Sequence, residues 1–414
     1  MKEKASSFPR KLGAAAVNIW ETPWSAALIA GFIYSLISIY HRQLLLTSSQ
    51  FPYYNYLADA FLHGQTWLRL IPQNTLDLSY FNGQYFLYWG PLPAILMMPM
   101  VAIFGVNFSD VIFTIFFAML NVALVAQLLR VASRVNFLQL SKVKRGILVF
   151  FFSLGTVFVT LAPYGKIWFT VQVVGLTFIL LAYLAAFSLK GGKAWFFSGL
   201  ALSGAMLTRN SMTFNGLFIL IYLLNREKPN TLRKVVGNLA WAALPLFLAL
   251  GFILVYDQVR FGNPLEFGIT YHLVSDFFYE DFHKYGYFNL RYIPTNLYYQ
   301  YIFYPLPLRA ESTMGGSLFL LSPVFFGAFF AFRKPRNKIW VWALLGTILL
   351  VNIPILLLMG TGYLQFGPRY TLDFIVPLLL LTALGVENWP TGLLAGLSVI
   401  SAIQYFMGVG LTKI

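Results

Sequence analysis

Cysteine is missing from this chain of 414 residues, and charged side chains make up only 10% of it. The lack of cysteine excludes disulfides, thiolate metal sites and a catalytic thiol. Histidine is nearly as rare, and no histidine lies in an HExxH pattern or a comparable ligand spacing, so a histidine metal site is not expected. The four histidines are His41, His63, His272 and His283.

The shortage of charge also bounds the class of protein. Soluble domains carry about 25% charged residues, whereas this chain is 58% hydrophobic and has a mean hydropathy of +0.70. Such a chain cannot cover a surface that faces water, so most of it must face lipid or other buried helices. The net charge of +15 would suit nucleic acid. The basic residues, however, cluster in short loops between apolar runs, which is typical of membrane orientation. We therefore expect membrane lipids, and no nucleic acid, as partners.

Long apolar runs predict the fold. A helix needs about 20 mostly apolar residues to cross a membrane. Lipid offers no hydrogen bonds, so the backbone N–H and C=O groups of a span must bond to each other, as they do in a helix. We therefore predict an all-α, polytopic membrane protein that forms one transmembrane domain over residues 1–414. The candidate runs lie near 24–45, 89–106, 110–130, 146–163, 168–188, 194–208, 211–225, 235–256, 314–332, 338–359, 370–386 and 390–411.

Basic loops predict the orientation of these runs. Lys and Arg gather in the N-terminal tail and in short loops, which should all be cytoplasmic. If both 89–106 and 110–130 crossed the bilayer, the basic loop 130–145 would fall outside the cell. The three prolines of 89–106 favour a short interfacial or re-entrant helix instead. About 11 spans then remain, with the N-terminus inside and the C-terminus outside. The basic loops lie near 130–145, 190–193, 226–234 and 333–338.

Two long segments, 46–109 and 257–313, then face outward, and every other connection is short. Long loops carry function more often than short ones. We therefore expect the chemistry on the outer face of a plasma membrane, contributed by these two segments. The second segment is rich in aromatic residues, which suit the headgroup level of a membrane, sugar stacking or an isoprenoid chain.

The first outer segment opens with an amphipathic helix, FPYYNYLADAFLHG. Asn55, Asp59 and His63 recur every four residues and form one polar stripe. Tyr53, Leu57 and Phe61 form an apolar stripe on the neighbouring face. Gly64 is a plausible C-terminal cap. We predict that this helix lies along the membrane surface, with its rings toward lipid and Asp59 toward water or a cavity. A solvated carboxylate is the alternative reading of Asp59.

A second pattern follows in LRLIPQNTLDLSYFNGQYFLYWGPLPAILMMP. Asn82-Gly83 predicts a tight turn, Asp77 precedes it, and Trp89-Gly90-Pro91 leads into the short apolar helix. This order of one span, a surface helix ending in glycine, Asn-Gly, Tyr-Phe and Pro-Leu-Pro resembles membrane glycosyltransferases of the GT-C class. Protein O-mannosyltransferases and bacterial aminoarabinose transferases are examples of that class. There is one departure, because Ser49 and Gln50 stand where those families carry an acidic residue.

The resemblance implies a polyprenyl-phosphate-linked sugar as donor and a glycan, lipid or protein as acceptor. Transfer then needs a carboxylate to take the acceptor's proton and cations on the departing phosphate. No cofactor is required, and dependence on a divalent metal stays open. Asp59 is the first candidate for the base and Asp77 the second. The candidates for the donor phosphate are Arg369, Arg260, Lys166 and Arg209, and those for the sugar or acceptor are Asn55, His63, Trp89 and Tyr85.

Other readings of these cations stay open. Arg369 and Asp373 are four residues apart, so on one helix they could form an ordinary ion pair. Lys166 and Arg209 could be anchors that extend their charge to the membrane surface.

Two other functions compete with sugar transfer. A transporter or lipid flippase usually shows inverted repeats and ionisable residues at the membrane midplane, and neither pattern is clear here. A ligase or polymerase of surface polysaccharide would also use lipid-linked sugars and a large outer loop. The pattern in the first outer segment favours the transferase.

Overall fold

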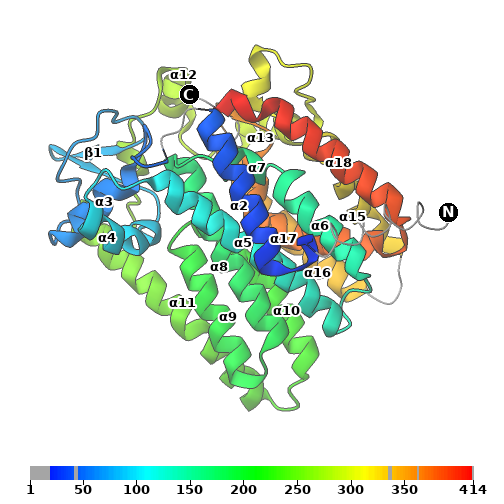
Figure 1. Ribbon diagram of the computed structural model, residues 1–414. Coiled ribbons are helices and arrows are strands. Elements are labelled where there is room, and N and C mark those ends of the chain that lie inside the picture. Colours follow the sequence, from blue (N-terminus) through cyan, green and yellow to red (C-terminus); the bar gives the residue numbers. More distant parts are fainter. Residues whose placement is uncertain (1–18, 42–44, 334–337, 361–362, 413–414) are drawn as a thin grey trace.

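The computed structural model describes residues 19–41, 45–333, 338–360 and 363–412, and it is 72% helical (Figure 1). The prediction of an all-α membrane protein is confirmed. Within the described ranges, eight helices are long and apolar enough to cross a membrane. They are α2 (Pro23–Tyr40), α5 (Asp110–Arg134), α6 with α7 (Lys142–Leu161), α8 (Ile167–Ser188), α11 (Leu232–Phe261), α16 (Lys338–Leu357), α17 with its flanking turns (Arg369–Asn388) and α18 (Thr391–Leu411).

Other apolar runs form shorter helices, so the predicted count of 11 spans is not confirmed. These are α9 (Gly191–Met206), α10 (Gly216–Glu227) and the turns between Leu318 and Arg333. The run at 89–106 forms α4 (Leu92–Phe104), a helix of 13 residues. At about 1.5 Å per residue it is about 20 Å long, which is less than the roughly 30 Å of a bilayer core. This agrees with the expectation that 89–106 does not cross.

The helix ends that carry the basic loops 130–145 and 190–193 are each bound to a neighbouring helix end. Glu21, just before α2, binds Arg130 at the end of α5 and Arg145 at the start of α6. Glu227 at the end of α10 accepts a hydrogen bond from the amide of Gly191, where α9 begins. We call this region the basic end. In Figure 1, α12 and the strand β1 lie at the upper left, away from the lower parts of α9 and α10.

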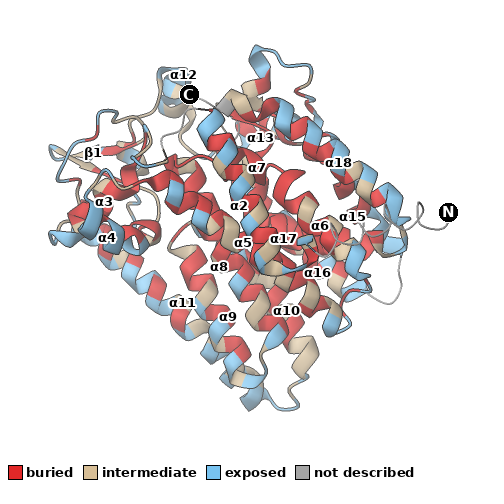
Figure 2. Cartoon of the chain, in the orientation of Figure 1, coloured by how far each residue is buried: buried red, intermediate tan, exposed pale blue. Residues whose placement is uncertain are grey.

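The core lies among the central helices, whereas α11 lies at the edge of the molecule and is largely exposed (Figure 2). In the most apolar stretch of the α17 span 94% of residues are buried, whereas only 22% are buried in that of α11. The exposed side chains along α11 are large and apolar, including Phe247 and Leu248. A lipid-facing position for α11 follows from this composition.

The first outer segment folds into a helix, a hairpin and the short helix α4. The helix is α3 (Tyr53–Leu62), followed by Gly64 at φ +72°, as the sequence predicts for its cap. Strands β1 (Ser79–Phe81) and β2 (Gln84–Phe86) pair antiparallel through Asn82-Gly83. Both turn residues have positive φ, which is the geometry of a two-residue type I′ hairpin.

The orientation predicted for α3 is wrong. Tyr53 and Leu57 are fully buried rather than turned toward lipid. They belong to a second hydrophobic cluster that includes Ala94 and Met97 of α4. The chain returns as α4 after the hairpin and covers the apolar face of α3, so protein replaces lipid there.

The second outer segment starts later than predicted, because α11 continues to Phe261 and ends at Gly262, which has φ +69°. Short helices follow: η2 (Ile269–Tyr271), α12 (Asp276–Tyr285), η3 (Leu290–Tyr292), α13 (Ile293–Leu297), η4 (Tyr298–Ile302) and η5 (Ala310–Thr313). Two backbone hydrogen bonds join the outer segments, from the Asp77 amide to the Leu273 carbonyl and from the Leu273 amide to the Leu78 carbonyl. These bonds bring the two predicted functional loops together.

Candidate functional site

A cavity of about 650 Å³ lies where the two outer segments meet the helix ends opposite the basic end. Its walls come from the loop before β1, the start of α8, the turn after α9, the end of α16 and the turn before α17. The polar side chains that line it include Asp77, Lys166, Gln172, Arg209 and Arg369. Five of the sequence-predicted site residues therefore share one cavity, namely one carboxylate, three cations and Trp89.

Asp77 is held by two side chains from other parts of the chain. The indole Nε1 of Trp168 donates a hydrogen bond to Asp77 Oδ2 at 2.8 Å. His272 Nε2 lies 3.1 Å from Asp77 Oδ1. Asp77 has φ +62°, a left-handed conformation that Asp tolerates better than most residues. Its carboxylate is thus fixed in direction, while about a quarter of its side chain stays exposed to the cavity.

Aromatic rings surround this carboxylate and its histidine. The ring of Tyr88 lies 4.6 Å from that of His272, and the ring of Tyr287 lies 5.7 Å from it. Trp89, a predicted sugar-binding residue, stacks on Tyr88 at 4.0 Å and lines the cavity. Flat aromatic faces beside a carboxylate suit a sugar ring.

Asp373, fully buried, pairs with Arg209 and not with Arg369. Arg209 Nη2 and Nε lie 2.9 Å and 3.1 Å from Asp373 Oδ2, and Ser211 Oγ donates to the same oxygen at 2.9 Å. Gln172 Nε2 donates to Oδ1 at 3.3 Å. Arg209 therefore lines the cavity with its charge already compensated.

The alternative of an Arg369–Asp373 ion pair is wrong, and the reason is local geometry. Residues Arg369–Phe374 form the 3₁₀-helix η9, not an α-helix. With three residues per turn, positions four apart point in different directions. Among the described residues no carboxylate pairs with Arg369, whose Nη2 instead donates to the Tyr370 hydroxyl at 3.2 Å.

Lys166, which precedes α8, brings a second cation to the cavity. The residue is only 5% exposed. Burial and, to a smaller extent, the nearby positive charge of Arg369 together lower the pKa of the Lys166 amine to about 8. Two cations that repel each other across a cavity form a site for an anion.

Apolar side chains make the other wall of the cavity. Phe278 and Phe288 come from the second outer segment, and Leu358, Met359 and Tyr363 follow the end of α16. An extended apolar wall next to a charged patch suits an amphiphilic molecule that has an anionic head and a hydrocarbon chain.

The structure places the first candidate base elsewhere. Asp59 does not line the cavity. Its two carboxylate oxygens accept bonds from Nε and Nη2 of Arg69, both at 3.0 Å. Arg69 comes from the loop after α3, so this pair closes the loop onto the helix.

Arg260 also lies outside the cavity, in a buried position at the end of α11. Its guanidinium pairs with Asp257, donates to the Leu87 carbonyl at 2.7 Å and lies 4.0 Å from the ring centre of Tyr256. These contacts tie α11 to the end of the hairpin. Arg260 therefore stabilises the packing of α11 against the hairpin.

Three further predicted residues lie away from the cavity lining. Asn55 is fully buried and donates to the carbonyls of Val106 and Phe108, which fastens α3 to the loop after α4. His63 Nδ1 lies 2.8 Å from the Asp59 carbonyl. Tyr85 packs against Tyr80 across the hairpin, with ring centres 5.0 Å apart.

Ser49, a loop residue where the resembled families carry an acid, contacts the carboxylate of Asp110 at the start of α5. Its amide and its hydroxyl each donate to Asp110, both at 2.7 Å. Asp110 is 2% exposed and does not line the cavity. An acid therefore stands near this position, but it serves to join the first outer segment to α5.

Sequence reasoning missed Trp168, His272, Tyr88 and Gln172. Trp168 and His272 lie 91 and 195 residues from Asp77 in the chain, so no local spacing links them. The described part of the chain contains no group of three or more His, Asp or Glu residues placed to share a metal ion.

Comparisons with known proteins give no match to a protein-family model or to a curated protein. Among solved structures, the chain is similar to ArnT from Cupriavidus metallidurans bound to undecaprenyl phosphate. The identity is 13% and the TM-score 0.49, and the match covers 94% of this chain and 75% of that one. It is also similar to the archaeal oligosaccharyltransferase AglB from Archaeoglobus fulgidus, in complex with an inhibitory peptide and a dolichol-phosphate. Here the identity is 13%, the TM-score 0.43 and the coverage 94% of this chain and 56% of AglB.

Both of these proteins are GT-C glycosyltransferases, the class that the first outer segment resembles. This chain spans about half the length of AglB. At these identities and TM-scores, neither likeness carries an argument about this chain. The chemistry of the cavity rests on the residues of this chain.

Proposed function

We propose that this protein is a glycosyltransferase that moves a sugar from a polyprenyl-phosphate carrier to an acceptor hydroxyl. The observation that carries the proposal is the shared cavity of Asp77, Lys166 and Arg369, with an apolar wall beside them. This combination offers a base, a phosphate site and a place for a hydrocarbon chain, which are the three needs of that reaction.

Lys166 and Arg369 would hold the donor phosphate. A cation shielded from water is costly unless an anion compensates it, and the half-buried Arg369 has no carboxylate partner among the residues described. Arginine and lysine form strong charge-assisted hydrogen bonds to phosphate oxygens. When the sugar departs, negative charge grows on the phosphate, and the same cations stabilise it.

Asp77 would act as the general base. The acceptor oxygen attacks the anomeric carbon, the bond from that carbon to the phosphate oxygen breaks, and its electron pair stays with the phosphate. The acceptor's proton passes to Asp77, whose two oxygens are already oriented by Trp168 and His272. General-base help of this kind is typically worth about 10²–10⁴-fold in rate.

The apolar wall would receive the isoprenoid chain, and the rings of Trp89 and Tyr88 would flank the sugar. Because basic loops stay in the cytoplasm, the basic end would lie inside the cell and the cavity would open outward. The protein would then work on the outer face of the plasma membrane, where the donor's sugar is exposed.

The first test is binding of undecaprenyl phosphate to the detergent-purified full-length protein, measured by native mass spectrometry against undecaprenol. We expect the phosphate to bind at least tenfold more tightly than the alcohol, because only the phosphate meets the two cations. Equal binding of the two lipids would remove the basis of the proposal.

The second test is transfer itself. The purified protein is incubated with radiolabelled pentose and hexose donors on undecaprenyl phosphate and with membrane extract as the source of acceptor. A labelled product that carries one added sugar supports the proposal. A long glycan product would indicate a polymerase or ligase. Movement of intact donor across liposomes without any product would indicate a flippase.

A further inference from the structure

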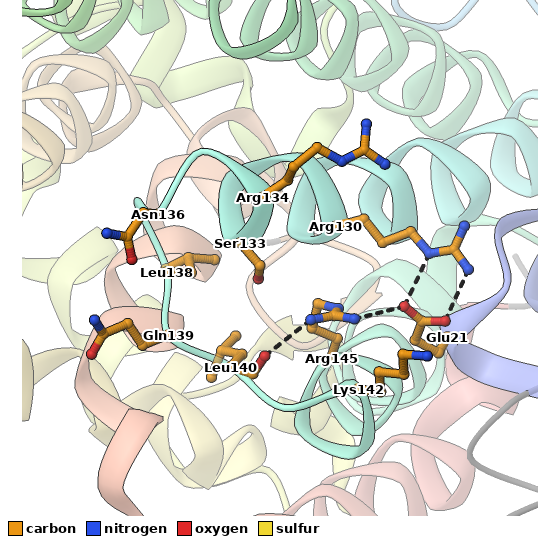
Figure 3. Close-up of a pocket in the computed structure, with 10 residues that line it drawn as sticks. All are labelled: Glu21, Arg130, Ser133, Arg134, Asn136, Leu138, Gln139, Leu140, Lys142 and Arg145. Atoms are coloured by element: carbon orange, nitrogen blue, oxygen red, sulfur yellow. Dashed lines mark hydrogen bonds and ion pairs between the residues drawn. The ribbon is translucent and has the colours of Figure 1, made fainter.

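A second cavity, of about 570 Å³, lies at the basic end between the end of α5 and the start of α6 (Figure 3). Glu21 lies at one side of it, just before α2. The charged residues that line it are Glu21, Arg130, Arg134, Lys142 and Arg145. None of them takes part in the chemistry proposed for the outer end.

Positive charge exceeds negative charge in this cavity. Its lining holds three arginines and one lysine against a single carboxylate, that of Glu21. Hydrogen bonds from Arg130 and, to a smaller extent, Arg145 lower the pKa of Glu21 to about 2. Glu21 is therefore ionised at any physiological pH, and it still compensates only part of the charge.

Both oxygens of the Glu21 carboxylate accept hydrogen bonds from arginines. Arg130 Nε and Nη2 bind its two oxygens at 3.0 Å and 2.8 Å, and Arg145 Nη2 binds Oε1 at 2.9 Å. In Figure 3 both guanidinium groups reach Glu21, whereas Arg134 projects from α5 away from it. A further carboxylate beyond the lining, Glu387, accepts a hydrogen bond from the backbone amide of Gln139.

The positive charges of Arg134 and Lys142 are not compensated by Glu21. Neither forms an ion pair or a side-chain hydrogen bond within the described ranges. The Nε of Arg145 is also buried without a partner there.

We infer that this cavity binds a phosphate group, supplied by an anionic lipid headgroup or by a small phosphorylated compound. Guanidinium forks match phosphate oxygens in pairs, and the lysine adds a mobile point charge. The position supports the assignment, since basic pockets between helices at the cytoplasmic side of a membrane suit anionic headgroups. Occupation would tie α5, α6 and the start of α2 together at the end opposite the outer cavity.

The test compares binding by two double variants of the full-length protein. Arg134→Gln with Lys142→Gln removes the two unpaired cations and leaves the Glu21 pairs intact. Lys190→Gln with Lys193→Gln is the matched control, because these lysines belong to the basic end but not to the cavity lining. The probes are dioleoylphosphatidylglycerol, with dioleoylphosphatidylcholine as the zwitterionic reference, and glycerol 3-phosphate.

Native mass spectrometry measures the lipids, and titration calorimetry measures glycerol 3-phosphate. We expect the wild type and the lysine control to bind phosphatidylglycerol or glycerol 3-phosphate. The Arg134/Lys142 variant should bind at least tenfold more weakly with an unchanged Tm, since it loses two charge-assisted contacts. Binding of the lipid alone identifies a headgroup site, and binding of both identifies a site open to soluble phosphates.

Three outcomes would overturn the inference. One is wild-type binding of phosphatidylglycerol no stronger than that of phosphatidylcholine, together with no binding of glycerol 3-phosphate. The others are an equal loss in the lysine control, and unchanged binding by the Arg134/Lys142 variant. If that variant does not purify, Lys142→Gln alone gives the same comparison, because Lys142 is exposed at the start of α6. None of these readouts depends on sugar transfer.

Discussion

Arg209 lies 2.9 Å from the carboxylate of Asp373, and this pairing leaves Arg369 without an acidic partner among the described residues. The two arginines line the same cavity, but only one of them has its charge compensated. A ligand phosphate would supply what Arg369 lacks. The difference between these two side chains leads to the first prediction.

Arg369→Gln should raise the KM for the lipid-phosphate donor by about 10–100-fold, the equivalent of one charged hydrogen bond of about 1.5–3 kcal/mol. Steady-state kinetics with varied donor measure it. Arg69→Gln is the control, since Arg69 is an outer-end arginine that pairs with Asp59 outside the cavity. Comparable KM changes in both variants would argue against a specific phosphate contact at Arg369.

Asp77→Asn should lower kcat by about 10²–10⁴-fold, because the amide cannot take the acceptor's proton. Donor binding and Tm should stay close to wild type, since Asn keeps the shape of the side chain. Asp59→Asn should retain most of the activity, because Asp59 is bound to Arg69 away from the cavity. If the Asp59 variant were the inactive one, the assignment of the base to Asp77 would be wrong.

Alkaline pH should lower the proposed transfer activity through Lys166. Its pKa is lowered to about 8 from the usual value near 10.5, so the positive charge is present below pH 8 and is lost as pH rises through it. We expect kcat/KM, which reports on the free enzyme, to fall between about pH 7 and 9. Lys166→Arg keeps its charge over this range and should remove the fall. A pH profile identical in wild type and Lys166→Arg would exclude this lysine as the cause.

Trp168→Phe should lower kcat by about tenfold while KM changes little. The variant keeps an aromatic ring but loses the Nε1 hydrogen bond of 2.8 Å that orients Asp77. A hydrogen bond to a charged group is worth about 1.5–3 kcal/mol, and the lower end of this range corresponds to about tenfold. A rise in KM with constant kcat would instead place Trp168 in substrate binding. The kcat and KM of the same variant distinguish these roles.

Arg260→Gln should reduce stability rather than catalysis. Its guanidinium is buried with Asp257, and removing one partner of a buried ion pair costs about 3–5 kcal/mol because the other charge stays uncompensated. Thermal unfolding followed by tryptophan fluorescence measures the loss. The KM of the folded fraction for the donor should match that of wild type. A rise in this KM without a loss of stability would indicate that Arg260 binds the donor phosphate after all.

Much of the fold was predictable, because lipid imposes strong limits on sequence. Helical spans, the short α4 and the Asn82-Gly83 hairpin all follow from local composition. The orientation of α3 was not predictable in the same way. Its apolar stripe was read correctly, but lipid and the face of α4 are equally apolar environments, so periodicity alone cannot choose between them.

The candidate site was predicted in part. Asp77, Lys166, Arg209 and Arg369 do share a cavity, because predicted outer ends of spans must lie at one level of the membrane. Asp59 and Arg260 lie at the same level but outside the cavity, because Asp59 pairs with Arg69 and Arg260 pairs with Asp257.

The sequence by itself determined the class of the protein, because a chain with so few charges can bury its surface only in lipid and in helix contacts. It also determined which ends of the helices carry the excess of basic residues. Only the tertiary structure decided which charges neutralise each other. Partner choice depends on contacts between residues far apart in the chain, such as Arg209 with Asp373 and Asp77 with His272, and on the 3₁₀ geometry that turns Arg369 away from Asp373. The spacing of residues along the sequence predicts neither the long-range pairs nor this local geometry.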